Sequence, residues 1–219
     1  MVAEEFETAN KLIDATRHIV VSEGIEGCSL EKICARAGFT RGAFYSNFST
    51  KDELFAALAE DEYARLIDGL TDTVQGWAKA GPGEVTMEAL LDEVLEVLQL
   101  DRDFYVLHSE LLNRSVRDPK WGMRLAEINS QFIRQVAQVL ETIAEATGRV
   151  VHVSSISLAH AVVGIALRAA NIGAMRAALA GKDLHATEPA QDIVQMLLTL
   201  IYASTTEPVQ QKDSHKIAK

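Results

Sequence analysis

The sequence predicts an all-α protein, and three observations support this prediction. Apolar residues recur at the three-to-four-residue spacing of an amphipathic helix along nearly the whole chain, whereas no convincing alternating segment indicates a strand. The 219 residues include only four prolines, and 48% of them are hydrophobic, as is ordinary for a helix-rich globular protein. Capping residues and glycines stand where the periodic segments begin and end. Together these features predict about nine helices, three short ones followed by six longer ones.

The first 50 residues are expected to form three short helices separated by tight turns. Gly24 can end the first helix in a left-handed conformation, and Gly38 can do the same for the second. Ser29 and Thr40 are suited to cap the second and third helices, the third of which extends to about Phe48. Because so short a helix is not stable alone in water, it must be held by packing. This order of elements is the helix-turn-helix pattern.

Longer helices are predicted for the rest of the chain. Thr50 and Glu53 have the spacing of a capping box that opens a long helix, and the stretch AGPGE at 80–84 is the clearest break. Further helices are expected at about 85–99, 102–117, 121–147, 154–180 and 188–204. We therefore expect a helix-turn-helix domain at 1–50, a larger helical domain at 51–205, and a polar, disordered tail at 206–219.

The charge of the chain is unevenly distributed. The formal net charge is −10, but residues 1–51 carry a net of only −1, and the window 32–51 holds four bases and no acid. A chance gap in the acids is one explanation. A surface that meets the phosphate backbone of DNA is the other, because an acid there would reduce the affinity.

Composition also limits the compartment and the class of protein. The two cysteines, Cys28 and Cys34, cannot form a disulfide framework, and no metal-ligand spacing surrounds them. No secretory signal pattern and no run of eighteen apolar residues is found, so we expect a cytoplasmic protein with no membrane partner. Known catalytic motifs are lacking, and the six histidines are scattered. We expect no enzymatic activity, no catalytic residue, no cofactor and no metal site.

One face of the third helix is typical of a surface that binds double-stranded DNA. Arg41 can donate to a guanine edge or a phosphate, and the small Gly42 and Ala43 let the helix lie deep in a major groove. Phe44 and Phe48 lie on the opposite face and anchor the helix on the core. The predicted DNA-binding residues are Ser29, Thr40, Arg41, Gly42, Ala43, Tyr45, Ser46, Asn47 and Lys51.

Residues 29–55, SLEKICARAGFTRGAFYSNFSTKDELF, closely resemble the DNA-binding module of TetR-type (tetracycline-repressor-like) transcriptional regulators. The resemblance rests on ICARAGFT at 33–40, YSNF at 45–48 and KDEL at 51–54, and it covers about 50 residues. Two positions depart from the family pattern. Asn47 stands where histidine is common, and Cys34 stands where alanine is common.

The resemblance implies that 1–50 form the DNA-binding domain and 51–205 the ligand-binding and dimerisation domain. It implies a homodimer that binds a palindromic operator and is released by a small effector molecule. It also implies that the last two long helices pair with their copies, and small residues at 164–174 independently favour close helix contacts. For a mainly apolar effector, the sequence-predicted ligand residues are Phe104, His108, Trp121, Phe132, Asn171 and Met175; Tyr105, Met123 and His160 are further candidates.

Three alternatives remain open at this stage. The helix-turn-helix segment can serve as an amphipathic hairpin that only packs against a protein partner, and the chain would then show no salt-dependent DNA binding. An enzyme without a recognisable motif is the second alternative. In the third, Cys28 or Cys34 acts as a redox sensor, although Cys34 is expected to be buried where two helices cross.

Overall fold

The computed structural model describes residues 2–80, 86, 89, 93, 101–180 and 191–207. The elements are α1 (Val2–Glu23), the 3₁₀ turn η1 (Ile25–Gly27), α2 (Leu30–Ala37), α3 (Arg41–Asn47), α4 (Lys51–Ala80), α6 (Arg102–Arg117), α7 (Pro119–Ala146), β1 (Val150–Val151), α8 (Ser155–Ala180), α9 (Gln191–Ser204) and β2 (Thr205–Thr206). The predicted all-α class is confirmed. The AGPGE break, nearly all of the helix expected at 85–99, and the segment 181–190 lie outside the described residues.

The three-helix module at the N-terminus forms as its capping residues predict. Gly24 and Gly38 both have φ of 76°, so each occupies a conformation that only glycine adopts readily. The Ser29 hydroxyl oxygen accepts a hydrogen bond of 3.2 Å from the backbone N–H of Lys32. The Thr40 hydroxyl oxygen accepts one of 3.2 Å from Ala43 in the same way. Local side-chain chemistry therefore sets the bounds of α2 and α3.

Helix α3 is held by the aromatic residues on its inner face. Phe44 is 1% exposed, and its ring centroid lies 5.9 Å from that of Phe48, which is also buried. Both belong to a core that includes Leu12 of α1 and Ile33 of α2. Burial of one such side chain contributes about 2–3 kcal/mol, which is enough to hold a seven-residue helix that would not form alone.

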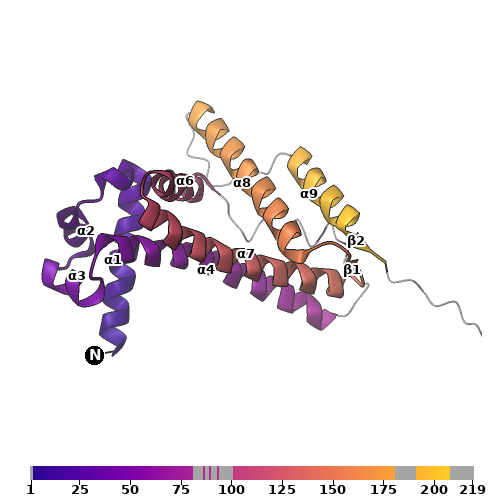
Figure 1. Cartoon of the computed structure of the whole chain (residues 1–219), viewed down its shortest axis with the longest axis horizontal. Helices are drawn as coiled ribbons and strands as arrows, with labels where there is room; N and C mark the ends of the chain where they lie inside the picture. Colours follow the sequence, from indigo (N-terminus) through magenta and orange to yellow (C-terminus); the bar gives the residue numbers. More distant parts are fainter. Residues whose placement is uncertain are drawn as a thin grey trace, which may run out of the picture.

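Helix α4 connects the module to the helical bundle. Thr50 accepts a hydrogen bond of 3.1 Å from the N–H of Glu53, while the Glu53 carboxylate accepts one of 2.7 Å from the N–H of Ser49, so the predicted capping pair is present. Figure 1 shows the module at one end of an elongated molecule, with α4 and α7 running side by side away from it. The buried core continues from Phe44 through Phe55 to Trp121, so the module and the bundle share one core.

The turn between α6 and α7 follows the predicted stop at Asp118–Pro119. Asp118 ends α6, and its carboxylate caps α7 by accepting from the N–H groups of Lys120 and Trp121. Pro119 occupies the first turn of α7, where its missing N–H costs nothing. A Cβ on Gly122 would lie 2.8 Å from the Ser115 carbonyl oxygen. Glycine therefore lets α6 and α7 approach closely beside the turn.

A short pair of antiparallel strands corrects the expectation that the chain has no strand. Val150 pairs with Thr206 and Val151 with Thr205. The guanidinium of Arg149 donates to the Thr205 hydroxyl at 2.7 Å and to its carbonyl oxygen at 3.0 Å. Two residues per strand are too few to show an alternating pattern, so these strands cannot be recognised from periodicity. Thr206, the first residue of the expected tail, lies in this pair, and 208–219 lie outside the described residues.

Helix α8 is unusually apolar in composition. By length and composition alone, its segment Ser155–Arg176 could cross a membrane, although only 22% of it is buried inside the structure. One such helix is weak evidence of a membrane span, since helices of soluble bundles also pass this test. In the fold, α8 packs against α6, α7 and α9 as a member of the bundle.

Candidate nucleic-acid interface and ligand cavity

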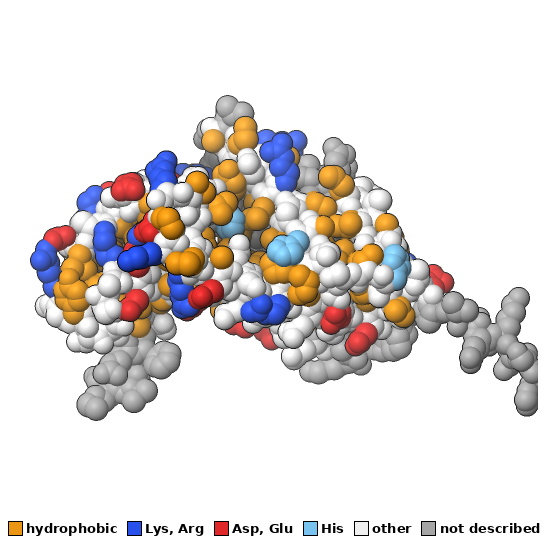
Figure 2. Space-filling model, viewed as in Figure 1, with side chains coloured by type: hydrophobic (Ala, Val, Ile, Leu, Met, Phe, Trp, Pro, Cys, Tyr) orange, Lys and Arg blue, Asp and Glu red, His pale blue; other side chains and the backbone are white. Residues whose placement is uncertain are grey.

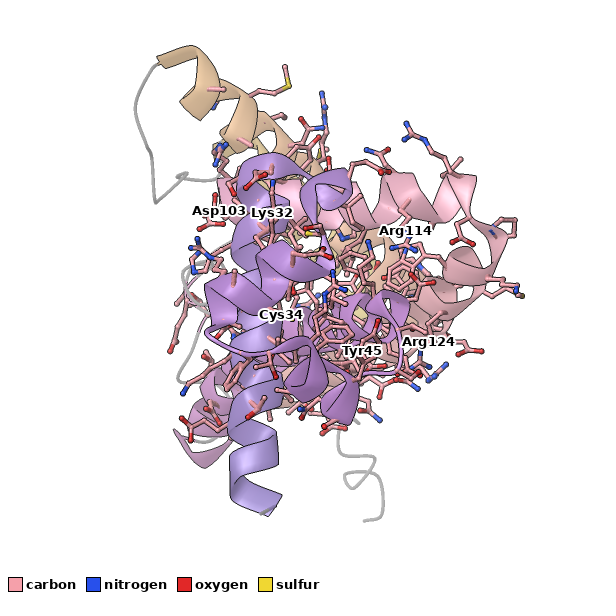
Figure 3. All side chains as sticks on the ribbon, turned by 90° about the vertical axis from the view of Figure 1, so that its left-hand side faces the viewer. Lys32, Cys34, Tyr45, Asp103, Arg114 and Arg124 are labelled. Atoms are coloured by element: carbon pink, nitrogen blue, oxygen red, sulfur yellow. The ribbon has the colours of Figure 1, made fainter. Side chains whose placement is uncertain are left out.

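The predicted DNA-binding residues gather on the outer face of α3 and at the ends of its neighbours. Tyr45 is 60% exposed, and Arg41, Gly42 and Ser46 are also exposed, while Ala43 and Asn47 are half-buried. Thr40 is exposed at the start of α3, and Ser29 lies half-buried at the start of α2. In Figure 3, which views the molecule from the module's end, Tyr45 lies on α3 in front, whereas Arg114 and Arg124 come from the bundle.

Hydrogen bonds within the module decide which of these side chains remain available to DNA. Ser46 donates its hydroxyl to the Gly42 carbonyl at 3.1 Å, and Asn47 donates its amide to the Ala43 carbonyl at 2.8 Å. The Ser46 hydroxyl hydrogen is therefore used within α3, while Asn47 keeps one N–H. Thr40 only accepts in its cap, so its own hydroxyl hydrogen stays free.

Lys51 combines a structural contact with an exposed charge. Its ammonium donates to the carbonyl oxygen of Cys28 at 3.1 Å, which ties the start of α4 to the end of η1. An ammonium group has three N–H donors, so two remain for a phosphate. The first backbone N–H groups of α4 lie beside it and favour an anion as well.

Arg41 forms an ion pair with Glu31 of α2, and both side chains are more than half exposed. Glu31 stands one residue before the acid-free window 32–51, so the charge pattern of that window did not indicate this acid. The turn between α2 and α3 brings the two side chains together across ten positions of sequence. The outer face of α3 therefore carries a carboxylate, that of Glu31, beside the guanidinium of Arg41.

Arg36 is a second cation that sequence analysis did not assign to DNA. It is exposed in the last turn of α2 and, within the parts of the chain that the structure describes, has no ion pair. Lys32 of the same helix differs, because it pairs with Glu23 of α1. Its unpaired charge makes Arg36 a candidate phosphate contact.

The bundle contains a cavity of about 680 Å³ between α4, α6, α7 and α8. Its wall is mostly aliphatic and aromatic, with a few polar side chains. The lining residues include the rings of Tyr63, Phe104, His108 and Phe132 and the polar side chains of Ser130, Arg134 and His160. Figure 2 shows hydrophobic and histidine side chains gathered in the middle of the visible face. The volume lies within the ~300–1,000 Å³ range of small-molecule sites.

Aromatic rings stack in two pairs along the α4–α6–α7 side of the cavity. The rings of Tyr63 and Phe132 lie 4.5 Å apart at an interplanar angle of 19°, and those of Phe104 and His108 lie 5.9 Å apart at 18°. The Tyr63 hydroxyl lies 3.3 Å from Nδ1 of His108. Burial raises the pKa of Tyr63 to about 12 and lowers the pKa of His108, so both rings are uncharged at neutral pH.

The sequence-predicted ligand residues divide into two groups. Phe104, His108 and Phe132 line the cavity, as does the further candidate His160, whereas Trp121, Asn171 and Met175 do not. Trp121 is 2% exposed, donates its indole N–H to the Leu111 carbonyl at 3.0 Å, and packs on Phe55. Met175 is exposed, as is Met123, and both Asn171 and Tyr105 are half-buried.

Several lining residues were not identified from the sequence. Tyr63 stands in an apolar stripe of α4 and resembles an ordinary core residue, while Ser130 and Arg134 are spaced like a solvated helix face. The Arg134 guanidinium donates to the Ser130 hydroxyl at 2.8 Å. A tyrosine hydroxyl within an otherwise apolar helix face was the one signal that could have identified Tyr63.

A smaller, polar hollow of about 310 Å³ lies where α1, α4 and α6 meet. Arg17 crosses it to pair with Asp61 and with Glu62, the latter at 3.0 Å. Arg65 joins the network by pairing with Asp61 at 3.0 Å and with Asp14 at 3.3 Å. These partly buried ion pairs fix α1 of the module against α4.

Helix α6 also contacts the module directly. The Glu110 carboxylate accepts a hydrogen bond of 2.9 Å from the backbone N–H of Ile25. The Arg114 guanidinium pairs with Asp52 in the first turn of α4 and lies 5.0 Å from the Phe55 ring centroid and 5.4 Å from that of Trp121. Because His108 lies on α6 as well, the cavity wall and the module contacts belong to one helix.

Both cysteines are buried free thiols. Burial raises the pKa of Cys28 to about 11 and also raises the pKa of Cys34, so neither forms an appreciable amount of thiolate at neutral pH. Among the described residues, no cluster of three His, Cys, Asp or Glu side chains could hold a metal ion.

A helix-turn-helix module joined through one core to a helical bundle with an internal cavity defines a two-part, all-α class of DNA-binding architecture. Comparison with known proteins agrees with this class. Residues 12–58 match the family described as bacterial regulatory proteins, tetR family. The comparisons therefore support a TetR-type regulator, with the match in sequence centred on the helix-turn-helix module.

Two curated relatives illustrate the similarity. The HTH-type transcriptional regulator SrpR of Pseudomonas putida is 34% identical over 95 residues, which cover 42% of each chain. The HTH-type transcriptional repressor AcnR of Corynebacterium efficiens is 25% identical over 115 residues, or 49% of this chain and 61% of that protein. The matched segments thus span about half the length of these relatives.

Solved structures extend the likeness in fold to nearly the whole chain. A putative TetR-family regulator from Mesorhizobium loti superposes with a TM-score of 0.66 at 15% identity and covers 91% of this chain and 95% of that one. A putative TetR-family regulator from Rhodococcus sp. gives 0.69 at 14% identity, with 91% and 99% covered. At this level of identity the comparison shows the fold alone.

Proposed function

We propose that the chain is a sequence-specific DNA-binding regulator of transcription, most simply a repressor, which acts in the cytoplasm as a homodimer on a palindromic operator. A small, mainly apolar effector bound in the cavity releases it from the DNA. The function is not enzymatic. The observation that carries the proposal is α3 itself: its inner face is fixed by Phe44, while its outer face presents Tyr45 and Arg41 to solvent.

Binding follows from the shape and charge of this face. Gly42 and Ala43 give α3 a flat surface that can approach base edges in the major groove, where Arg41 reads a guanine. Lys51 and the first N–H groups of α4 hold one phosphate, and Thr40 donates to another. The name of AcnR, a transcriptional repressor, supports repression as the simplest outcome.

A dimer supplies the second reading helix that a palindrome requires. Large apolar side chains are exposed on α8 and α9, among them Ile156, Met175, Met196 and Tyr202. A second copy that covers this surface would bury it and would place two α3 helices on successive major grooves, about 34–36 Å apart.

Release by an effector uses the helices that line the cavity. A ligand that binds better when α4 and α6 are displaced shifts the population toward that arrangement. Glu110 and Arg114 then transmit the displacement of α6 to η1 and to the start of α4. This changes the separation of the two α3 helices, so the operator is bound less tightly.

The decisive experiment selects bound fragments from the source genome with the full chain and measures their affinity by fluorescence anisotropy over a range of salt concentrations. We expect one palindromic sequence to bind at least ~10³-fold more tightly than random DNA. Lys51→Ala should weaken binding to all sequences and reduce the salt slope by about 1, whereas Arg41→Ala should relax preference at one position of each half-site.

Arg102→Ala is the matched control, because it removes an exposed arginine in the first turn of α6, outside the module. It should leave both affinity and salt slope unchanged. Two outcomes would instead favour a helix-turn-helix that packs only against protein. In the first, binding to DNA does not depend on salt; in the second, the Arg41 and Lys51 variants bind DNA as tightly as the parent.

A further inference from the structure

The chemistry of the cavity wall restricts the effector more narrowly than its apolar character does. Four rings line the α4–α6–α7 side, in the stacked pairs Tyr63–Phe132 and Phe104–His108. The two pairs meet where Tyr63 and His108 lie 6.4 Å apart, ring centroid to ring centroid. Planar rings of this kind pack favourably against another aromatic ring, edge-on or offset.

The one hydrogen bond between these rings leaves a donor for a ligand. In the tautomer of neutral His108 that carries its hydrogen on Nε2, Nδ1 accepts the hydrogen bond from the Tyr63 phenol. Nε2 has no hydrogen-bond partner in the part of the chain that the structure describes. Nε2 is accessible to solvent, so a ligand in the cavity that offers an acceptor atom can take the place of water at this N–H.

The charges around the cavity disfavour a cationic ligand. No Asp or Glu is among the described residues that line it, so a buried cation would lack a counter-charge. Among the described lining residues, the one charged side chain is that of Arg134, which is exposed and bonded to Ser130. A carboxylate placed against the stacked rings would be desolvated without a cation beside it. These observations favour an uncharged group at the aromatic side.

We propose, building on the effector role in the proposed function, that the cavity binds an uncharged aromatic compound whose carbonyl or ether oxygen accepts a hydrogen bond from Nε2 of His108. The ring of the ligand packs against the Tyr63–Phe132 and Phe104–His108 pairs. The aliphatic walls on α7 and α8 enclose the rest of the ligand. His108 sets the specificity for an acceptor, and the absence of an acid on the described wall sets the specificity against cations.

Four probes that share a naphthalene body test this proposal by equilibrium dialysis with the full chain. They are 2-acetylnaphthalene, with a neutral acceptor; 2-ethylnaphthalene, with none; 2-naphthoate, an anion; and 2-naphthyltrimethylammonium, a cation. We expect the ketone to bind up to about tenfold more tightly than the ethyl compound, which is the net contribution of one additional hydrogen bond. The cation should bind at least about tenfold more weakly than the ketone.

Variants identify the donor. His108→Leu should lower the affinity for the ketone to that of the ethyl compound without weakening the ethyl compound, and His108→Gln, whose amide also donates, should restore part of the preference. His160→Leu is the matched control, since it removes a second histidine from the α8 side of the same cavity. It should leave the ratio of the two affinities unchanged.

Several results would overturn the proposal even if a variant failed to fold, because the ranking of probes by the parent chain is sufficient. The proposal fails if the ammonium probe binds most tightly, or if naphthoate binds most tightly and loses this affinity in Arg134→Gln. It also fails if the ketone and the ethyl compound bind with equal affinity, or if no probe binds. Operator affinity of the same samples separates this failure from that of the proposed function. A chain that binds its operator but ignores the ketone refutes the ligand class alone, and one that binds the ketone but no DNA refutes the regulator.

Discussion

The carboxylate of Glu110 accepts a hydrogen bond of 2.9 Å from the backbone N–H of Ile25, 85 positions earlier in the chain. Glu110 lies on α6, two residues beyond His108, and Ile25 opens η1 in the helix-turn-helix module. The carboxylate also lies against Gly24, where an added Cβ would come within 3.3 Å of Oε2. The cavity wall and the DNA-binding module are therefore joined by a bond between a side chain and a backbone amide.

Loss of this bond should destabilise the chain and weaken the link between cavity and module. Glu110→Ala leaves the Ile25 N–H, on a buried residue, without its acceptor, so we expect the free energy of unfolding to fall by about 1–3 kcal/mol. Glu110→Gln retains an acceptor oxygen and should lose much less. Urea unfolding of the two variants and the parent measures both changes. Equal losses in the two variants would show that the negative charge matters rather than the hydrogen bond.

Glu31 should weaken DNA binding in the parent chain, because its carboxylate pairs with Arg41 on the face of α3 proposed to meet DNA. Glu31→Gln frees the guanidinium and removes a repelled charge. We expect tighter binding to all DNA sequences and a salt slope steeper by about 1. Anisotropy titrations at several salt concentrations measure both quantities. Glu127→Gln removes an exposed acid from α7 and provides the control. A weaker Glu31 variant would mean that the carboxylate orients Arg41 for a base.

His108 should make stability depend on pH in the mildly acidic range. Burial lowers its pKa in the folded chain below the value of 6.5 that applies when it is unfolded. The unfolded chain therefore binds more protons as the pH falls, and the free energy of unfolding decreases below about pH 6.5. Urea titrations between pH 5 and 8 should show this slope in the parent and a smaller one in His108→Gln. An unchanged slope would place its origin in another group.

The buried thiols should resist alkylation in the folded chain. Burial raises the pKa of Cys28 to about 11, so at pH 8 its thiolate is scarce as well as shielded. Intact-mass spectrometry after iodoacetamide treatment should show no rapid adduct on the native chain and two adducts in urea. Rapid modification of the native chain would revive the redox alternative, and a Cys28→Ser, Cys34→Ser variant would then have to lose its sensitivity to oxidant.

Local signals predicted the DNA-binding module closely. Ser29, Thr40 and Thr50 act on backbone groups within three residues of themselves, and Gly38 requires only its own dihedral angles. The anchors Phe44 and Phe48 stand four apart on one helix, so their shared direction follows from helical geometry. The predicted recognition face needed no knowledge of the other helices, because it is the face that these anchors leave outside.

The cavity was less predictable because the described part of its wall comes from four different helices. Phe104, His108 and Phe132 were singled out as bulky or polar breaks in apolar faces, but Trp121 has the same signal and lies outside the cavity against Phe55. Which break faces a hollow depends on how far apart the helices sit. The sequence pattern around Tyr63 is that of a core residue. Only the packing of α6 and α7 against α4 places His108 and Phe132 beside it.

The sequence by itself determined the helices, their caps and the outward face of α3, since each depends on interactions within a few residues. The tertiary structure alone decided that Glu31 pairs with Arg41, that Tyr63 meets His108, and that Glu110 holds the backbone of Ile25. Each of these contacts joins residues on different elements, between ten and 85 positions apart. Periodicity within one helix carries no information about such distances, because they are set by the packing of whole helices against one another.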